Sequence, residues 1–241
     1  MTVAGRLRRR RLSSILAPPP EARPHEGESL AERYGRMAHE GYEPLPVDPV
    51  LRALDVAISA AALGVLSPLM ALIGIAVRLD SEGPALYRGL RVGREGRIFT
   101  MFKFRTLSSD AELRLGPYLG AELTRLTQHE VTRVGRVLRA SYLDELPQLI
   151  NVLAGDMSVV GPRPIRPAFF EELCRDIPEY WQRLVVRPGI TGFAQLRMTR
   201  EMTWAEKLAH DLEYVADRSV GLYLRVILDT LAVIPRRGRG G

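Results

Sequence analysis

A long uncharged segment constrains the fold of this chain more than any other feature of its sequence. From Val56 to Val77 no charged residue occurs, and charged residues flank the segment on both sides. Roughly 20 consecutive apolar residues are enough for a helix to cross a bilayer, so length alone predicts a transmembrane helix. A buried core helix of a soluble protein is the alternative, although so long an uncharged stretch exceeds the usual length of core helices.

Ser67 and Pro68 lie at the middle of this segment. Proline removes a backbone hydrogen bond and bends a helix. Cationic segments flank both sides, so the positive-inside rule selects no orientation. A helix that enters the membrane, breaks at Ser67-Pro68 and returns to the same face accounts for both the central proline and the cationic flanks. The Ser67 hydroxyl is available to bond a backbone group that the break leaves unpaired. We therefore predict a re-entrant membrane helix over residues 48–80.

The two ends of the chain have compositions that do not build a core. Residues 1–47 begin with an arginine cluster and continue as a mixture rich in proline, glutamate and glycine. Such a composition predicts a disordered basic, proline-rich arm, with attraction to anionic lipid headgroups as an alternative to a merely solvated tail. We assign residues 81–235 to a catalytic domain on the cytoplasmic side and residues 236–241 to a basic tail.

Composition narrows the classes of partner and cofactor. The formal net charge is +6, which favours phosphates, nucleic acid or an anionic membrane surface. Cys174 is the single cysteine, so an internal disulfide is excluded and a buried small hydrophobe is expected. The histidines lack the spacing of zinc ligands and no glycine-rich nucleotide fingerprint occurs. The scattered histidines are His25, His39, His129 and His210.

An acidic pair marks the stretch where we expect chemistry. Asp144 and Glu145 are adjacent, Pro147 follows, and apolar residues then recur at helical spacing. The pair is therefore predicted to open a helix, whose N-terminus keeps a carboxylate ionised and favours a phosphate beside it. Helix capping alone is the competing explanation for the sequence Asp-Glu-x-Pro.

A cationic strand precedes the acidic pair in the sequence. Residues 99–105 alternate as a strand does and place Lys103 and Arg105 on one face. Two neighbouring cations repel each other, so an anion bound between them would explain the pattern. A solvated strand face explains it equally well.

Further arginines come from separate segments near the pair. Arg139 ends a row of helically spaced arginines, Gly161–Pro164 is a rigid turn that presents Arg163, and Arg187 lies in a second turn. Arginine binds phosphate through paired hydrogen bonds and stabilises charge that develops on its oxygens. The combination therefore suggests work on a phosphate ester.

The two carboxylates suit two different tasks in such chemistry. A carboxylate can attack phosphorus to give an acyl phosphate. Mg²⁺ typically takes one or two carboxylates together with substrate phosphate oxygens. Because neighbours on a helix point about 100° apart, Asp144 and Glu145 are expected to divide these tasks.

Four sequence blocks in this order resemble the bacterial sugar transferase family, whose short members are monotopic phosphoglycosyl transferases, also called polyprenyl-phosphate hexose-1-phosphate transferases. The blocks are the apolar run with Ser-Pro, LDSEGPALYRGLRVGREGRIFTMFKFRTL, LDELPQLINVLAGDMSVVGPRP and RPGITGFAQL. The resemblance covers about residues 51–234. It implies transfer of a sugar-1-phosphate from a UDP-sugar to polyprenyl (undecaprenyl) phosphate with release of UMP, the first membrane step of exopolysaccharide or O-antigen-type glycan assembly.

The resemblance also implies residue roles. Asp144 falls on the family's nucleophile, which carries a covalent phospho-sugar, and Glu145 on the residue associated with Mg²⁺. The phosphate-binding positions fall on Lys103, Arg105, Arg139 and Arg163, to which we add Arg187 from its constrained turn. Tyr142 departs from the family by replacing a smaller residue, which would alter the shape of the pocket.

The expected fold is α+β and mainly helical, with the re-entrant helix broken at Ser67-Pro68 and a small strand element. The expected location is the cytoplasmic face of the bacterial inner membrane, with membrane lipids as partners, no nucleic acid, and homo-oligomerisation left open. A membrane-anchored scaffold, which would release no UMP, and a soluble nucleic-acid binder, which would need no detergent, are the competing hypotheses. The sequence does not identify the sugar.

Overall fold

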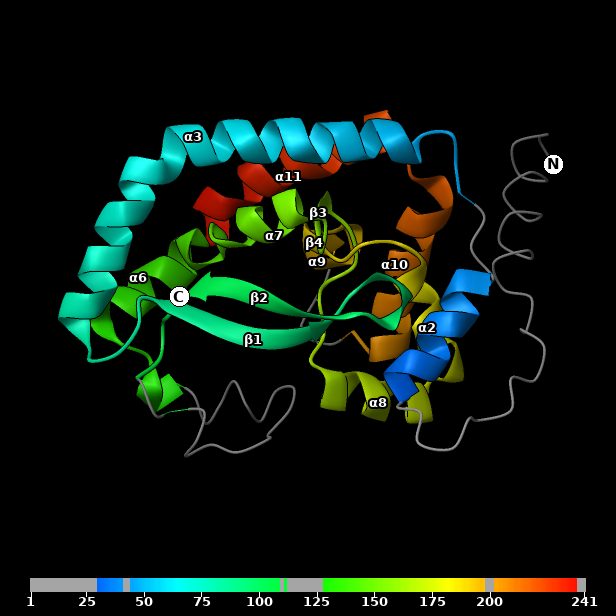
Figure 1. The fold of residues 1–241 in the computed structure, drawn as a ribbon, viewed down its shortest axis with the longest axis horizontal. Coiled ribbons are helices and arrows are strands. Elements are labelled where there is room, and N and C mark those ends of the chain that lie inside the picture. Colours follow the sequence, from blue (N-terminus) through cyan, green and yellow to red (C-terminus); the bar gives the residue numbers. More distant parts are fainter. Residues whose placement is uncertain (1–29, 41–43, 109–110, 112–127, 198–201, 238–241) are drawn as a thin grey trace.

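The computed structural model describes residues 30–40, 44–108, 111, 128–197 and 202–237, and within them the chain is mainly helical with two small sheets (Figure 1). The α-helices are α2 (Leu30–Glu40), α3 (Asp48–Asp80), α6 (Arg133–Ser141), α7 (Gln148–Ala154), α8 (Pro167–Asp176), α9 (Phe193–Arg197), α10 (Trp204–Asp217) and α11 (Val220–Arg237). The strands are β1 (Leu86–Val92), β2 (Ile98–Phe104), β3 (Ser158–Val160) and β4 (Gly189–Thr191).

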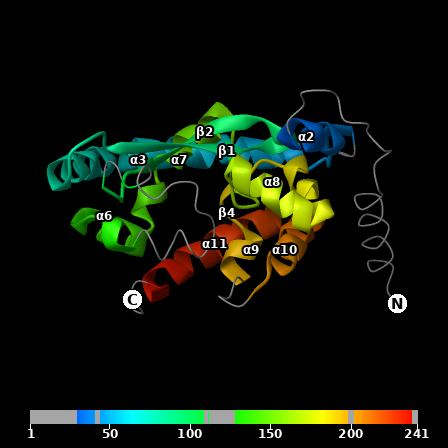
Figure 2. The ribbon, with the colours of Figure 1, turned by 90° about the horizontal axis from the view of Figure 1, so that it is seen from below.

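The hairpin of β1 and β2 runs through the middle of the domain. The two strands are antiparallel, with Leu86 opposite Phe104 and Val92 opposite Ile98. Figures 1 and 2 both show α6 at one end of the hairpin and α2 and α8 at the other. The second sheet is the parallel pair β3 and β4. Their backbones approach so closely that a Cβ atom on Gly189 would lie 2.1 Å from the Gly161 nitrogen, so this position requires glycine.

Helix α3 is continuous but bends sharply partway along its length (Figure 1). Pro68 lies inside it and lacks the N–H group that would bond the Gly64 carbonyl in a regular helix. The Ser67 hydroxyl donates a hydrogen bond to that carbonyl over 3.1 Å. The hydroxyl thus takes over the acceptor that the proline abandons, as the sequence predicted, although the predicted break is a bend within one helix.

Most of the apolar surface of α3 is uncovered. Within the described residues, α3 is the one helix that is long and apolar enough to cross a membrane, judged by length and composition alone, and only 11% of its most apolar window is buried. A core helix of a soluble protein would be mostly buried, so the core-helix alternative does not fit this structure. The large exposed apolar residues in the second half of α3 are Val65, Leu69, Leu72, Ile75 and Leu79.

A buried carboxylate ties the first half of α3 to the rest of the domain. Asp55 is 2% exposed and accepts hydrogen bonds from the Ser158 hydroxyl, the Val159 N–H and the Tyr223 hydroxyl at 2.8–2.9 Å. These donors belong to β3 and α11, so one side chain joins three elements that are far apart in the sequence.

Other contacts fix the two ends of α3. At its start, Asp48 forms a paired ion contact with Arg218 over 2.6 Å and 2.9 Å. At its end, the Asp80 carboxylate accepts from the Val134 N–H of α6 over 2.8 Å. Both ends of the exposed apolar helix are therefore held by one and the same domain.

The predicted disorder of residues 1–47 is wrong for Leu30–Glu40, which forms α2. The helix packs its Gly35 against the backbone of Glu95 so tightly that a Cβ atom would lie 2.2 Å from the carbonyl oxygen, and it buries Ala38 completely. Packing of one small-residue face against the hairpin turn thus orders a segment whose composition resembles that of a disordered arm. The rest of the predicted arm, 1–29 and 41–43, and residues 238–241 of the predicted tail lie outside the described residues.

Replacing Asp55 by alanine should destabilise the fold strongly. The change leaves three buried donors without an acceptor, at about 1–3 kcal/mol each. We expect the midpoint of thermal unfolding in detergent to fall by at least roughly 6 °C, given about 2–4 °C per kcal/mol for a domain of this size. The exposed acid Glu82 provides the control, because Glu82→Gln should leave the midpoint nearly unchanged. An equal, small shift in both variants would contradict the anchoring role of Asp55.

Candidate active site

The acidic pair lies in a tight turn between α6 and α7. Tyr142 adopts a left-handed conformation (φ 58°) that ends α6 and reverses the chain. The next residues, Leu143–Glu145, form a 3₁₀ turn, and α7 begins at Gln148, after Pro147. The prediction that the pair opens the helix is therefore wrong in detail. The short segment between Tyr142 and Pro147 forms 3₁₀-type hydrogen bonds, from the Glu145 N–H to the Tyr142 carbonyl and from the Leu146 N–H to the Leu143 carbonyl. The acidic pair therefore lies in this turn, before the first residue of α7.

Asn151 positions α7, and with it the acidic pair, against the hairpin. Its side chain accepts a hydrogen bond from the Phe102 N–H over 3.0 Å and donates one to the Thr100 carbonyl over 2.7 Å. It therefore pairs with the free edge of β2 as a neighbouring strand would. Asn151 is 1% exposed, so both bonds are sheltered from water.

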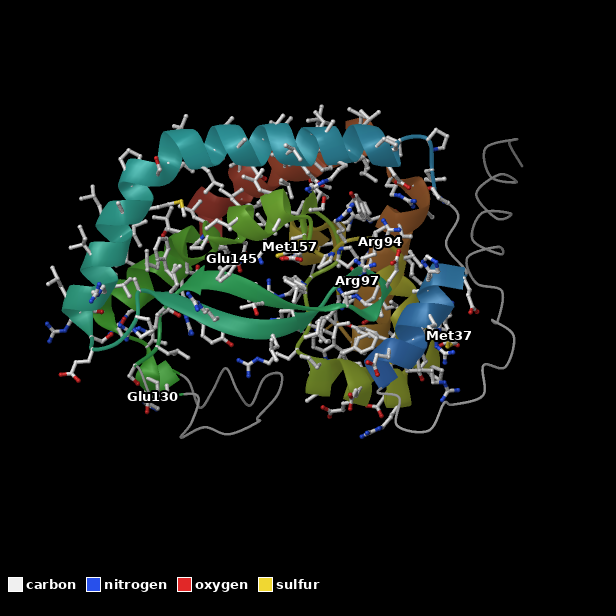
Figure 3. All side chains as sticks on the ribbon, viewed as in Figure 1. Met37, Arg94, Arg97, Glu130, Glu145 and Met157 are labelled. Carbon is white, nitrogen blue, oxygen red and sulfur yellow. The ribbon has the colours of Figure 1, made fainter. Side chains whose placement is uncertain are left out.

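This docking places Glu145, which is labelled in Figure 3, opposite a cation of β2. The Lys103 Nζ lies 2.6 Å from the Glu145 Oε1, and the Arg163 guanidinium lies 4.0 Å from the same oxygen. Burial alone would raise the pKa of Glu145, but Lys103 and Arg163 outweigh burial, so the pKa lies below its usual value. Glu145 is therefore held as a carboxylate.

Asp144 experiences a different balance. Burial raises its pKa, Lys103 opposes that shift, and the Glu145 charge adds to it, so the net pKa lies above the usual value of an aspartate. Arg139, whose Nε donates to the Thr106 hydroxyl over 2.9 Å, also favours the Asp144 carboxylate. The two neighbouring acids thus have pKa values that are shifted in opposite directions, which is a frequent sign of divided catalytic roles.

A basic pocket of about 260 Å³ opens beside Glu145. It extends along the hairpin from Lys103 toward the base of α8. The Gln148 side chain lines it and is 2% exposed, and its buried nitrogen has no hydrogen-bond partner among the described residues. An anionic oxygen in the pocket would supply an acceptor. The cations that line the pocket are Arg91, Lys103, Arg163 and Arg166.

A second pocket, of about 200 Å³, meets the first at Glu145 and is mostly apolar. Its lining comes from the turn, α7, β4, α9 and α11. Tyr142, which replaces a smaller residue of the family, lines this apolar pocket and does not line the basic pocket. The apolar side chains around it are Leu146, Leu149, Ile190, Leu196 and Val233.

Two predicted phosphate-binding arginines lie elsewhere. The Arg105 guanidinium is 7% exposed and donates three hydrogen bonds to Ser81 and Pro84, in the loop after α3. Arg187 donates to the Gly155 carbonyl over 2.8 Å and lines a separate pocket beside the hairpin turn. The structure therefore brings Lys103, Arg139 and Arg163 to the acidic pair but gives Arg105 and Arg187 contacts that support loops.

A buried arginine that the sequence did not reveal supports Arg163. Arg183 is 4% exposed, donates to the Arg163 carbonyl over 2.7 Å, and pairs with the Asp211 carboxylate at 2.9 Å. Arg183 lies outside the four sequence blocks and Asn151 lies inside one of them, but each bonds the backbone of a residue distant in sequence, and no local pattern shows such a contact. The polar character of Asn151 among the apolar residues of α7 is the one signal that could have drawn attention to it.

The acidic pair fits a magnesium ion only in part. Among the described residues no group of three or more histidine, cysteine, aspartate or glutamate side chains gathers as a metal site. Glu145 supplies one carboxylate at the basic pocket, and its neighbour Asp144 supplies a second that does not line the pocket. That donor set suits Mg²⁺ when substrate phosphates complete its coordination, and does not suit a metal held by protein ligands alone.

Comparisons with known proteins show the family of the chain. A family model described as Bacterial sugar transferase matches residues 48–237. The chain is 42% identical over 196 residues to the UDP-glucose:undecaprenyl-phosphate glucose-1-phosphate transferase of Caulobacter vibrioides, a match that covers 78% of this chain and 72% of that protein.

Two other relatives show how the matched region is used. The exopolysaccharide production protein PSS of Rhizobium leguminosarum bv. phaseoli is 38% identical over 200 residues, covering 78% of this chain and 96% of that protein. The UDP-glucose:undecaprenyl-phosphate glucose-1-phosphate transferase of Escherichia coli is 37% identical over 187 residues, covering 75% of this chain but 39% of that protein. The same region therefore makes up nearly all of one relative and less than half of another.

Replacing Asn151 by leucine tests how α7 is docked. The near-isosteric side chain fills the space but leaves the Phe102 N–H and the Thr100 carbonyl unpaired, so we expect a loss of about 2–4 kcal/mol in unfolding free energy. Chemical denaturation in detergent measures it. The control on the same helix is Ile150→Ala, which removes a 43% exposed side chain and should cost well below 1 kcal/mol. Equal losses in both variants would show that Asn151 does not hold α7 on β2.

Proposed function

Because this chain belongs to the bacterial sugar transferase family, we propose that it transfers a sugar-1-phosphate from a UDP-sugar to undecaprenyl phosphate and releases UMP. The observation that carries the proposal is Glu145, the neighbour of Asp144, which lines both a basic pocket and an apolar pocket on a domain that bears an exposed apolar helix. The proposed role is the first membrane step of exopolysaccharide or O-antigen-type glycan assembly. The names of the relatives from Caulobacter and Rhizobium support both the reaction and this role.

The basic pocket suits the donor. A UDP-sugar brings two linked phosphates, and Lys103 and Arg163 already meet at the Glu145 carboxylate, where those phosphates would lie. Arginine and lysine at this position offset charge on the phosphate oxygens as the bond to the leaving group lengthens. The buried Gln148 amide adds an uncharged donor at the same wall.

Asp144 is the proposed nucleophile. One of its carboxylate oxygens attacks the β-phosphorus of the UDP-sugar, the bond from that phosphorus to the bridging oxygen breaks, and UMP departs with the electron pair. The sugar phosphate remains on Asp144 as an acyl phosphate. A phosphate oxygen of undecaprenyl phosphate then attacks the same phosphorus, the bond to Asp144 breaks, and the carboxylate is regenerated.

The opposite pKa shifts support this division of labour. A carboxylate with a raised pKa is the better nucleophile once ionised, which suits Asp144. Glu145 keeps its charge because Lys103 and Arg163 face it, so it is the residue that would hold Mg²⁺. Bound there with the donor phosphates, Mg²⁺ would neutralise part of their charge and ease the departure of UMP.

The apolar pocket suits the first isoprene units of the acceptor. It meets the basic pocket at Glu145, so a lipid chain in it would bring its phosphate to the acidic pair. Leu228 and Leu231 of α11 are 65% and 59% exposed, so α11 carries apolar surface outside the pocket as well. An apolar pocket together with exposed apolar side chains on the same helix is expected for an enzyme that takes its substrate from a bilayer.

The exposed helix is proposed to enter the cytoplasmic face of the inner membrane and return to it. Asp48 and Asp55 fix its first half, and Asp80 its end, to the same domain, so a straight crossing would pull that domain apart. The bend supports a re-entrant, monotopic arrangement because it lets the apolar middle insert while both ends stay outside. The proposed partners are therefore a soluble nucleotide sugar and membrane lipid.

Release of UMP from a panel of UDP-sugars by the detergent-solubilised protein tests the function. We expect Mg²⁺-dependent release with at least one sugar, and a loss of at least ~10³-fold in Asp144→Ala, because no other group replaces the attacking carboxylate. Asp176→Asn, an exposed acid of α8, is the matched control and should keep full activity. Full turnover by Asp144→Ala would exclude the covalent route, and no release with any sugar would contradict the proposed function.

The pH dependence of UMP release tests the charge on Asp144. The attacking carboxylate must be ionised, so the rate should fall as pH drops through a pKa that burial has raised above the usual aspartate value. Lys103 lowers that pKa, so Lys103→Met should move the acid limb of the profile to higher pH in addition to slowing the reaction. Arg88→Met, an exposed cation on β1, should leave the limb in place. An unshifted limb in Lys103→Met would show that Asp144 does not control it.

A further inference from the structure

The basic pocket has two chemically different ends. At one end Lys103 and Glu145 are paired, next to Asp144. At the other, Arg91 and Arg166 flank the bridge in which the Val92 N–H donates to the Ile165 carbonyl over 2.9 Å.

Two aromatic rings line the far end. Phe169 follows Arg166 in the first turn of α8, and its ring meets that of Trp204 edge to face, with centroids 4.9 Å apart and planes at 83°. Trp204 opens α10 and carries the Lys207 ammonium over its ring, 4.2 Å from the centroid. Both rings pack against the hydrophobic core and also line the pocket, where phosphate oxygens gain nothing from an aromatic ring.

The strand register sets the distance between the two ends. Lys103 and Phe99 lie four residues apart on β2, and Arg91 lies opposite Phe99. At about 3.3 Å per residue, Arg91 is therefore about 13 Å along the hairpin from Lys103.

This distance decides which part of a nucleotide sugar reaches the aromatic end. The hexose is joined through one oxygen to the phosphorus that Asp144 attacks, so it must stay close to the acidic pair. The nucleobase is separated from that phosphorus by a second phosphate and a ribose, and in an extended nucleotide it lies far enough away to reach Arg91.

We propose that Phe169, Trp204, Arg91 and Arg166 form the subsite for the uracil base of the donor, so that the base lies at the α8–α10 end and the hexose at the acidic pair. The inference rests on the proposed function. Aromatic rings bind a base by stacking. The guanidinium groups supply only donors, which match the carbonyl oxygens of uracil and not the amino group that adenine or cytosine presents.

Binding of UMP by the full-length protein in detergent tests this subsite, and titration calorimetry measures it without the lipid acceptor. We expect Trp204→Leu to weaken UMP binding roughly tenfold or more, as loss of a base-stacking ring does. Inorganic pyrophosphate, which lacks a base, should bind the variant as it binds the wild type, which shows that the pocket is intact. Trp204→Phe, which keeps a ring, should retain most of the affinity for UMP.

A second pair of variants tests the donors. Arg91→Ala should weaken UMP binding and reduce the preference for UMP over AMP. Arg88→Ala removes the same charge from the same strand, on the exposed face outside the pocket, and should change neither.

The outcomes separate the subsite from the function. Wild-type protein that releases UMP from a UDP-sugar, together with a Trp204→Leu variant that binds UMP normally, would overturn the subsite and leave the function standing. If Trp204→Leu binds UMP normally but binds the intact UDP-sugar more weakly, the hexose and not the uracil lies at Phe169 and Trp204, and the proposed uracil subsite is overturned. Wild-type protein that neither binds UMP nor releases it would overturn the proposed function itself.

Discussion

The structure depends on polar contacts that hold an apolar helix against a polar domain. Much of α3 is uncovered, and an apolar helix has no intrinsic preference for one position on a charged surface. The Asp55 carboxylate supplies that preference, because three donors from β3 and α11 converge on it in a site that water does not reach. Buried polar groups of this kind are costly unless every partner is present, so they specify one arrangement. The position of α3 is therefore fixed by hydrogen bonding in addition to the burial of a few apolar residues, such as Leu51, Ile73 and Val77.

The same contacts link the helix to the site. Ser158 and Val159, which bind Asp55, belong to β3, and β3 leads directly into the turn that carries Arg163. Arg183 holds the carbonyl of Arg163 from the other side. Through Asn151, the hairpin is likewise joined to the turn with the acidic pair. Each of these links is a side chain bonded to the backbone of a distant segment, so the separation of the charged groups is set by rigid elements and not by the charges themselves. A shift of α3 would be transmitted through β3 to the Arg163 turn, so these contacts link α3 to the proposed site.

Much of this arrangement could be predicted from the sequence, and the failures have physical causes. Ser67-Pro68, the strand around Lys103, the Arg163 turn and the acidic pair were all predictable, because each depends on local backbone chemistry or on a motif. Arg105 was predicted to bind phosphate because strand alternation places it beside Lys103, but alternation fixes only the direction in which a side chain leaves the backbone. A long side chain at a strand end can turn back, and here it bonds the loop after α3. The Arg183 bond to the Arg163 turn and the packing of α2 involve residues far apart in the sequence, so no local pattern reports them.

The position of Glu145 at the meeting point of two unlike pockets has a consequence for the proposed mechanism. A direct transfer would require the donor and the acceptor to lie on opposite sides of one phosphorus at the same moment, with both sets of phosphate charges crowded around Lys103 and Arg163. A covalent intermediate on Asp144 removes that requirement, because UMP can leave the basic pocket before the acceptor phosphate arrives from the apolar one. The cations then meet the two substrates in succession, so the few positive charges at the acidic pair suffice for both steps. The division of the site into a basic half and an apolar half therefore favours the two-step route over direct transfer.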